Sequence, residues 1–376
     1  MYSVFEEIEK LRGGHSFRVN DIFTNRYTVH CQESGGIKTA YCFSVPIRNI
    51  KTNNVVDLRF HHNNHGSSFI GSEAKVSVSD RVKIFNKHGE CDILFEGALS
   101  HKTEKAIFFT SAMRNIEIRP TLNGIMLLFD SDMAGGPAKI KLHFNRLFES
   151  VRANGKCFSV MRENLIPFMT VSCIGAMNSN GKVSAPCEIN YYKINDFEYV
   201  LAFTSSKKSQ NRIAIEINLQ ETKLFQDTTV ESGNPKANNA FGGVAFLGSG
   251  KMFGEQWLYS RLEFSNISRL KSKRIIKSIM HIPQLNDNTS QITVNKIAQR
   301  FCSFGSNWEN KIAPTDTVAA SIKSNGYYHL DLTKLFGGFS NNSENFVIRG
   351  NAASKPVAIS TGDSFYSPQI LEVIYN

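Results

Sequence analysis

The sequence predicts an all-β protein, and three observations support this fold class. Short apolar runs alternate with polar residues at every second position, which is typical of antiparallel strands with one buried and one solvated face. Turn-forming residues separate these runs. The chain also has 28 Phe and only 2 Trp, and its apolar runs are rich in Ile and Val, side chains that fit a pleated, half-buried surface.

A short amphipathic helix is expected before the first strand. Phe5, Ile8 and Leu11 are spaced to share one helix face, and a glycine pair that begins at Gly13 ends the helix. Because a helix of this length is marginal in isolation, we expect residues 1–14 to dock on another surface, such as a neighbouring subunit.

The predicted strands follow this helix at close spacing. Period-two alternation is clearest in four segments: Val76 to Val78, Ile116 to Ile118, Ile140 to Phe144 and Ile213 to Leu219. Five turn signals separate the strands: Ser34-Gly35-Gly36, Asn123-Gly124, Asn154-Gly155, Asn180-Gly181 and Asn325-Gly326. Many short strands joined by such turns predict antiparallel β-sandwiches of the jelly-roll kind.

A chain of 376 residues is too long for one ordinary core. We place boundaries near residues 148–155, where the predicted strand ending at Phe144 gives way to a more helical pattern, and near 222–227, after the predicted strand ending at Leu219. We therefore expect four parts: a docking helix (1–14), an N-terminal β-sandwich (15–150), a smaller β-rich middle domain (151–224) and a C-terminal β-sandwich (225–376).

The charge pattern restricts the partners. The formal net charge is +10, but the basic residues are dispersed, whereas a nucleic-acid footprint concentrates them on one element. A diffuse positive field suits an anionic surface polymer better. Glu6 and Glu7 stand where a signal peptide carries basic residues, and no apolar run reaches the roughly 20 residues of a membrane span. We expect a chain that is made in the cytoplasm and neither binds nucleic acid nor inserts into membranes.

Motifs for metal or phosphate chemistry are incomplete. His61, His62 and His65 have zinc-like spacing, but the surrounding Asn and Gly residues predict a solvated loop. Gly248 to Lys251 lacks the first glycine and the Ser/Thr of a phosphate-binding loop, so a hairpin turn is expected. The Asx-rich segments 130–132 and 286–288 fit calcium binding and self-satisfied turns equally well. No cofactor or metal is predicted.

The seven cysteines are odd in number and scattered, and none forms a Cys-x-x-Cys pair. Buried free thiols are the expected state for all of them. A cysteine hydrolase built from Cys157, Cys173 or Cys187 with His143 as base has no local signature in its favour.

The C-terminal part resembles the DNRLRE-type β-sandwich domains. The matching segments, in order, are Asp227-Thr228-Thr229-Val230, Phe241-Gly242 to Leu247-Gly248, Leu258 to Phe264, Arg274 to Ile282, Ser306 to Asn310, His329 to Thr333 and Ser364 to Tyr375. The resemblance extends over roughly 150 residues, from Asp227 to Tyr375, although the hexapeptide that names the family is missing. The resemblance implies a β-sandwich that binds or builds without chemistry of its own, in proteins directed to cell surfaces or carbohydrates.

Carbohydrate binding, if present, is expected around exposed aromatic and amide side chains. Trp308 lies in a polar segment with Asn307 and Asn310, and Tyr327 is a further aromatic candidate. An aromatic face matches the C–H patches of a sugar ring. For Tyr328 and Trp257, which lie in or beside predicted core strands, packing inside the sandwich is the expected role.

Together these features predict a non-enzymatic structural protein of a phage or phage-tail-like particle, such as a tail fibre or baseplate protein. The C-terminal sandwich would attach to a host-surface polysaccharide, and a homo-oligomer, for which we take a trimer, would add avidity. Two alternatives remain: a capsid decoration or head-fibre protein, and a carbohydrate-active enzyme with unidentified carboxylates.

Overall fold

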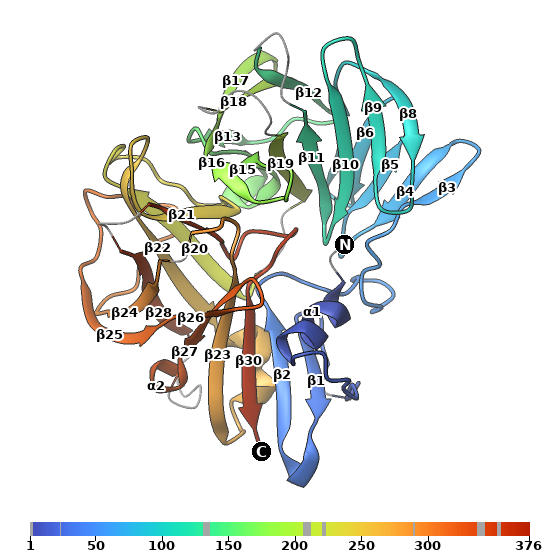
Figure 1. Ribbon diagram of the computed structural model, residues 1–376. Helices are drawn as coiled ribbons and strands as arrows, with labels where there is room; N and C mark the ends of the chain where they lie inside the picture. The colour runs from blue at the N-terminus through green and yellow to red at the C-terminus, as the bar shows by residue number, and fades with distance from the viewer. Residues whose placement is uncertain are drawn as a thin grey trace. The chain divides into compact units, whose positions relative to one another are not determined.

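The computed structural model describes residues 3–22, 24–130, 136–205, 212–219, 223–288, 290–336, 343–351 and 355–376. It confirms the all-β fold class, and the strand pairings in these ranges are antiparallel. Two compact units make up the chain (Figure 1). We call residues 49–221 the inserted unit, and residues 2–48 together with 222–376 the terminal unit.

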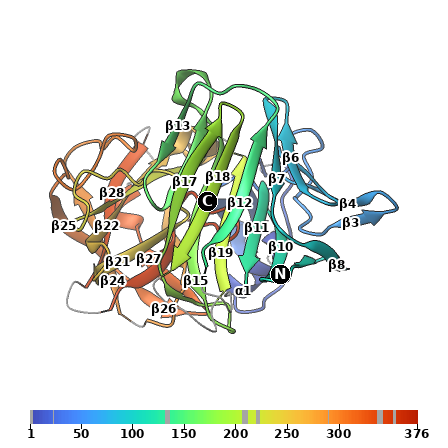
Figure 2. The same ribbon diagram turned by 90° about the horizontal axis from the view of Figure 1, so that it is seen from above.

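The inserted unit contains two sheets. One runs in the order β17-β18-β12-β7-β6-β5-β4-β3. Its strands are β3 (His61–Asn63), β4 (Gly66–Ile70), β5 (Lys75–Val78), β6 (Val82–Asn86), β7 (Gly89–Leu94), β12 (Ala138–Phe144), β17 (Cys187–Asn195) and β18 (Glu198–Ser205). Figure 2 shows β17, β18 and β12 side by side in this sheet.

The other sheet of the inserted unit runs in the order β13-β14-β15-β19-β11-β10-β9-β8, with β16 paired to β15. Its strands are β8 (Ala98–Lys102), β9 (Ile107–Thr110), β10 (Asn115–Thr121), β11 (Gly124–Phe129), β13 (Ser150–Ala153), β14 (Cys157–Met161), β15 (Pro167–Met177), β16 (Val183–Ala185) and β19 (Arg212–Leu219). A 3₁₀ turn, Glu163–Leu165, joins β14 to β15.

Aromatic side chains from these two sheets meet in one core. The ring centroids of Phe129 (β11) and Phe203 (β18) lie 6.2 Å apart, and those of Phe158 (β14) and Tyr199 (β18) lie 5.5 Å apart. Such contacts between the inner faces of two antiparallel sheets define a β-sandwich. The inserted unit is therefore a sandwich in its own right.

The terminal unit also contains two sheets. The first runs in the order β1-β2-β30-β23-β27-β26. Its strands are β1 (Thr28–Gln32), β2 (Lys38–Phe43), β23 (Ile275–Pro283), β26 (Ile322–Ser324), β27 (Tyr327–Asp331) and β30 (Ile370–Tyr375). The short helical elements of the unit are α1 (Val4–Leu11), α2 (Thr333–Phe336) and two 3₁₀ segments, Ser34–Gly36 and Phe264–Leu270.

The second sheet of the terminal unit runs in the order β25-β24-β28-β22-β21-β29, with β20 paired to β22. Its strands are β20 (Phe225–Glu231), β21 (Val244–Gly250), β22 (Gly254–Glu263), β24 (Ile292–Ile297), β25 (Pro314–Ala320), β28 (Ser343–Gly350) and β29 (Val357–Ser360). One buried cluster takes side chains from both sheets, including Met280 and Leu371 from the first and Leu258 and Phe346 from the second. The terminal unit is a second β-sandwich.

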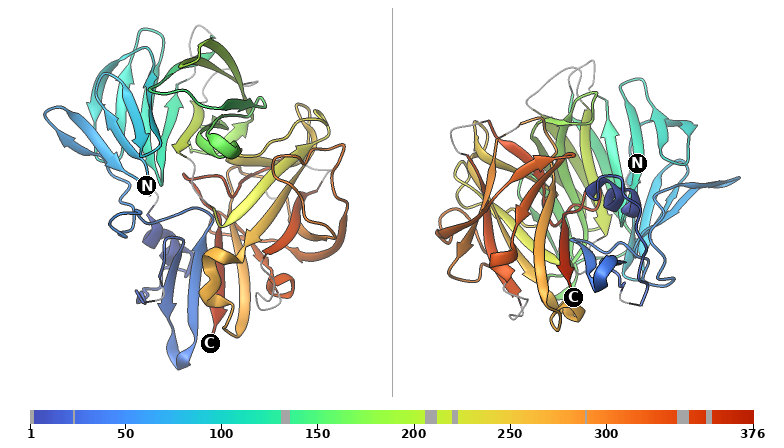
Figure 3. Two further views of the ribbon diagram at one scale, coloured as in Figure 1. Left: turned by 180° about the vertical axis from the view of Figure 1, so that it is seen from behind. Right: turned by 60° about the horizontal axis from the view of Figure 1, so that its bottom comes forward.

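Strands from the two ends of the chain lie side by side in the terminal unit. Strand β2 pairs with β30 along its whole length, from Lys38 opposite Tyr375 to Phe43 opposite Ile370. Figure 3 shows the blue N-terminal strands beside the red C-terminal strand from behind. The chain leaves this sandwich after β2 and returns to it before β20. These two points are neighbours, as shown by the Leu224 amide, which donates to the Ser44 carbonyl at 2.9 Å.

This grouping differs from the four parts expected from the sequence. Residues 28–43 join the sheet of β30 through β2 and belong to the terminal unit, whereas residues 150–219 share both sheets with strands between residues 61 and 144. The reason is that pairing between distant segments decides which strands share a core, and local composition does not record that pairing.

Alternation predicts some strands well and others only in part. In β12 buried and more exposed residues alternate along the whole strand. In β19 the polar positions are buried too, with Glu216 1% and Asn218 3% exposed. The hydroxyl of Thr121 donates to the Asn218 side-chain oxygen at 2.5 Å, so this polar group is satisfied inside the sheet.

The predicted turns connect neighbouring strands. Asn325 and Gly326 form the two-residue connection between β26 and β27 with φ of 50° and 81°. Both values lie in the left-handed region that a tight hairpin of this twist requires, which explains the choice of Asn and Gly. Gly248 to Lys251 likewise lies at the β21–β22 hairpin, as expected.

Helix α1 packs on the terminal unit itself, with a face that includes the expected Ile8 but differs in part from the expected one. Val4 and Ile8 are buried, while Phe5 is 36% exposed and packs against Phe17. None of the helices in the described ranges has the length and apolar character needed to cross a bilayer.

Candidate functional site

The segment that carries Trp308 lies between β24 and β25, and its amide residues support the loop's own backbone. The Asn310 side-chain oxygen accepts the Asn307 amide at 2.8 Å, and the Asn307 side-chain oxygen accepts the Asn310 amide at 3.1 Å. The Asn310 side-chain nitrogen also donates to the Gly305 carbonyl at 2.9 Å. These two predicted sugar contacts are therefore engaged in reciprocal bonds within the loop.

Trp308 itself is half-buried in a stack of rings and cations. Its ring centroid lies 5.1 Å from that of Trp257, and the Lys311 ammonium lies 4.3 Å from the Trp308 centroid. On Trp257, the Arg349 guanidinium lies 4.6 Å from the ring centroid. A cation over an indole face is attracted by the ring's quadrupole. A sugar that stacks on that face of Trp308 must first displace Lys311.

Tyr327 lies in β27, in the other sheet of the terminal unit, and is 3% exposed. Its hydroxyl donates to the Glu7 carboxylate, and the Lys10 ammonium lies 5.0 Å from its ring centroid. Burial, together with the Glu7 charge, raises the pKa of the Tyr327 hydroxyl well above its usual range. The structure thus uses Tyr327 to hold helix α1, while the three other predicted site residues lie together in the Trp308 loop.

The other sequence motifs are also located. His61, His62 and His65 are exposed on the β3–β4 hairpin, and the His62 Nδ1 atom lies 2.8 Å from the Ser67 hydroxyl. No cluster of metal-ligating side chains is found among the described residues. Of segment 130–132, only Asp130 lies within them.

One cysteine expectation is wrong. Cys173 in β15 and Cys187 in β17 form a disulfide with Cα atoms 6.0 Å apart, whereas all seven thiols were expected to be free. The two strands belong to opposite sheets, so their proximity depends on sandwich packing and leaves no signal in local spacing. Cys31, Cys42, Cys91 and Cys157 are buried and outside any disulfide, as expected, and Cys302 is outside any disulfide but exposed.

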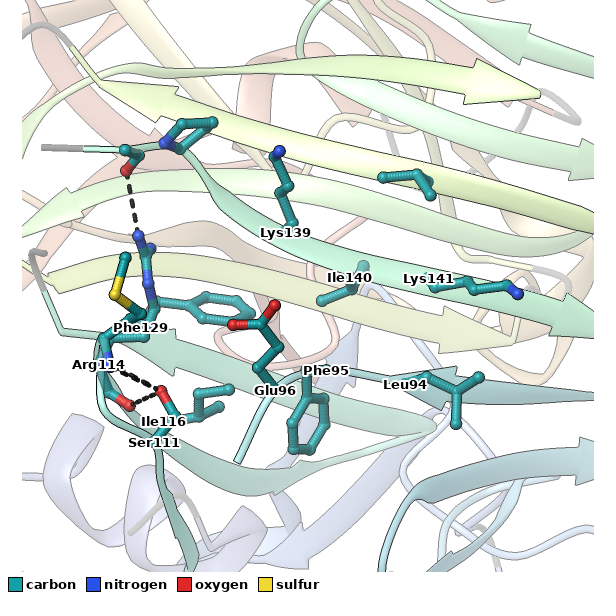
Figure 4. A pocket seen from close by; sticks show the side chains of 14 residues that line it. Leu94, Phe95, Glu96, Ser111, Arg114, Ile116, Phe129, Lys139, Ile140 and Lys141 are labelled. Atoms are coloured by element: carbon teal, nitrogen blue, oxygen red, sulfur yellow. Dashed lines mark hydrogen bonds between the residues drawn. The ribbon is translucent and has the colours of Figure 1, made fainter. Parts of the chain in front are cut away.

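The inserted unit contains a pocket that the sequence did not suggest (Figure 4). Its volume is about 500 Å³, within the range typical of small-molecule sites. Four apolar side chains form much of its wall: Phe95, Ile116, Phe129 and Ile140. Four charged residues also line it: Glu96, Arg114, Lys139 and Lys141. Both sheets of the unit contribute to this wall.

The pocket lies where one strand ends before its neighbour. Leu94, the last residue of β7, pairs with Lys141 of β12, so residues 138–140 of β12 extend beyond β7. The chain turns away at Phe95, whose ring packs edge-on against Phe109 with centroids 4.9 Å apart. A missing stretch of strand at this end of the sandwich leaves room that the pocket occupies.

The charged groups around the pocket are held in different ways. The Arg114 guanidinium donates to the Gly136 carbonyl at 3.1 Å, and Ser111 caps the Arg114 backbone, accepting its amide at 3.1 Å. Lys141 is paired with Glu198 at 2.7 Å. Lys139 is exposed, and in Figure 4 its ammonium points away from Ile140, whereas the Glu96 carboxylate lies beside the Phe129 ring. Amphipathic ligands with a negative group suit such a lining.

Only some of the residues that line this pocket could be recognised from the local sequence pattern. The alternation of β12 puts Lys139 and Lys141 on the same strand face, which is visible in the sequence. The contributions of Phe95 and Arg114 depend on where β7 stops and on which sheet faces it. We find no protein family that matches this chain, and no curated protein matches it either.

Proposed function

We propose that this protein is a non-enzymatic attachment protein of a phage or phage-tail-like particle, which binds an acidic carbohydrate of a bacterial surface. The observation that carries the proposal is the pocket of the inserted unit, with apolar walls beside Arg114 and Lys139. The net charge of +10 adds a diffuse attraction toward anionic polymers.

The chemistry of the pocket matches an acidic sugar in two respects. A half-buried aromatic side chain such as Phe95 packs against the C–H face of a pyranose. A guanidinium and an ammonium bind carboxylate or phosphate oxygens through charge-assisted hydrogen bonds. The inserted unit, rather than the C-terminal sandwich expected from the sequence, is therefore the primary binding region of this proposal, and the Trp308 loop is secondary because Lys311 covers a face of its ring.

The lining favours binding over glycoside hydrolysis. Glycosidases of the common kind need two carboxyl groups on either side of the scissile bond. Among the described residues that line this pocket, Glu96 is the only carboxylate. Release of reducing sugar from a purified surface polymer by the protein would contradict the non-enzymatic proposal.

The proposal is tested by sedimenting the intact protein with bacterial cells and with stripped cell walls. Lys139→Glu should weaken wall binding about tenfold, because one charge-assisted contact contributes roughly 1.5–3 kcal/mol. Lys51→Glu makes the same charge change at an exposed turn of the same unit, so it is the matched control. Equal losses in both variants would show that net charge, and not the pocket, carries the binding.

Particle location and assembly state form the second part of the proposal. Size-exclusion chromatography with light scattering should give a homo-oligomer, for which we propose a trimer that adds avidity. Antibody labelling of particles at the tail would support attachment. Labelling over the capsid would favour the alternative, a decoration or head-fibre protein.

A further inference from the structure

A buried amine and a buried acid lie in contact inside the terminal unit. Lys223 lies two residues before the start of β20, and Asp363 lies in the segment between β29 and β30. The Lys223 ammonium contacts the Asp363 carboxylate, and the two side chains are only 9% and 5% exposed. Removing two charges from water is costly, so a buried pair of this kind needs an explanation.

A second carboxyl group lies beside this pair. Asp227 is in β20, is 5% exposed, and accepts the backbone amide of Gly362, the residue before Asp363. Burial raises the pKa of the Asp227 carboxyl to about 7, although the Gly362 hydrogen bond and the Lys223 charge act in the opposite direction. Near neutral pH this group therefore exchanges a proton readily, whereas an ordinary aspartate stays ionised.

The surrounding backbone is shaped to hold these groups. Phe241 places its ring over Lys223, with the ammonium 5.1 Å from the centroid, and has a φ of 70°, which is unusual for an aromatic residue. At Gly362 an added Cβ would lie 2.8 Å from the Phe225 Cβ and 3.0 Å from an Asp227 carboxylate oxygen. Only glycine allows this approach, which brings the Asp363 segment against β20.

From this arrangement we propose that Lys223 and Asp363 join spontaneously in an intramolecular isopeptide bond. The neutral Lys223 Nζ attacks the Asp363 side-chain carbon, and a C–N bond forms while a C–O bond breaks. The departing oxygen leaves as water with protons that come from the lysine amine. An ammonium and a carboxylate thus become an amide and water, with no oxidant, cofactor or second protein.

The site desolvates, positions and assists the two reacting groups, none of which happens to a free amine and acid in water. In water the two ions are well solvated, so forming an uncharged amide is unfavourable; burial removes that solvation. Holding the amine against the acid replaces a bimolecular encounter with a positioned one. Asp227 carries the proton that passes from the lysine amine to the departing oxygen.

The bond has a defined mechanical consequence. It links the entry to β20 with the segment that leads into β30, the last strand of the chain. A pull on either end of that segment would load a covalent cross-link in place of strand hydrogen bonds alone. This inference is independent of the pocket and of the proposed attachment function.

Intact-mass spectrometry of the reduced, full-length protein tests the bond directly. We expect a mass lower than that of the unlinked chain by one water molecule. Trypsin does not cleave after an acylated lysine, so the digest should contain a branched peptide that joins residues 213–236 to residues 350–376. A full sequence mass, with residues 213–223, 224–236 and 350–376 recovered as separate peptides after prolonged incubation, would reduce the pair to an ordinary ion pair and overturn the proposal.

Three variants sharpen this test. Lys223→Arg retains the charge but should abolish the water loss, and Lys236→Arg, at a nearby exposed lysine, should leave it intact. Asp227→Asn keeps both reacting groups and should slow bond formation if circular dichroism shows it to be folded. The rate in the wild type should also vary with pH around the pKa of Asp227. A folded Asp227→Asn protein that links at the wild-type rate would overturn the role of Asp227 as proton carrier.

Discussion

The two sandwiches have the same architecture but are assembled from the chain in different ways. The inserted unit uses one continuous stretch, residues 49–221, and many of its paired strands are neighbours in sequence, such as β4 with β5 and β5 with β6. The terminal unit joins both ends of the chain through the β2–β30 pairing. Its folding therefore needs contacts between very distant segments, which cost more loop-closure entropy and form later.

The strongest test of this difference separates the two units. We expect residues 49–221 to fold alone, because both sheets of that sandwich lie within the segment. Residues 225–376 should not fold alone, because they lack β1 and β2, expose the edge of β30, and lose Ala40 and Cys42 from the core. Circular dichroism and urea titration of both fragments would check this. Cooperative unfolding of 225–376 would contradict the expectation.

A substitution that creates one steric clash in the inserted unit should destabilise that unit selectively. An added Cβ at Gly124 would lie 2.1 Å from the Ile217 carbonyl oxygen, so Gly124→Ala forces β11 away from β19. We expect a loss of about 3 kcal/mol in the free energy of unfolding of the inserted unit, typical of overpacking in a tight site. Differential scanning calorimetry should show one transition shifted and the other unchanged.

Gly242→Ala in the terminal unit is the matched control for that substitution. Its added Cβ would have only ordinary contacts, 3.7 Å from the nearest atom. Equal shifts of a single transition by both variants would mean that the two units do not unfold separately.

The terminal unit should also lose stability in mild acid. His30 is 2% exposed and its Nδ1 atom lies 2.7 Å from the Tyr375 hydroxyl. Burial, with the charges of Arg269 and Lys38, lowers the pKa of His30 to about 4. The unfolded chain takes up this proton near pH 6.5, so stability present above that pH is lost as the pH falls toward 4.

The loss should reach about 2 kcal/mol between pH 7 and pH 5, by the usual conversion of a pKa difference. Urea midpoints of the wild type and His30→Gln at both pH values measure it. The variant should lose less stability than the wild type over this interval, and parallel losses would exclude His30 as the cause.

The smallest expected effect concerns the Trp308 loop. Lys311→Ala removes an ammonium from the Trp308 face and should cost less than about 1 kcal/mol of stability, as expected for a partly exposed cation–π contact. If the loop binds sugar by stacking, the same substitution should strengthen wall binding by freeing the ring. Unchanged binding would leave the pocket of the inserted unit as the better candidate.

Local pattern and long-range pairing account for what could and could not be predicted from the sequence. Alternation in β12 and the Asn325-Gly326 turn are properties of a few adjacent residues, and both are visible without a structure. The β2–β30 pairing, the Cys173–Cys187 disulfide and the Lys223–Asp363 contact each join residues that only the folded sheets bring together. For the pocket, the lysines of β12 were recognisable, but the early end of β7 was not.

The points where the chain leaves and re-enters the terminal unit lie close together, and this affects which parts of the sequence can be altered without loss of the fold. Because Leu224 bonds to Ser44, everything between them can be regarded as one long excursion from an already closed sandwich. Such an excursion can be shortened, lengthened or exchanged with little entropic penalty, since its two ends are held together without it. The terminal unit could therefore stay unchanged while residues 49–221 are replaced as a block by another domain.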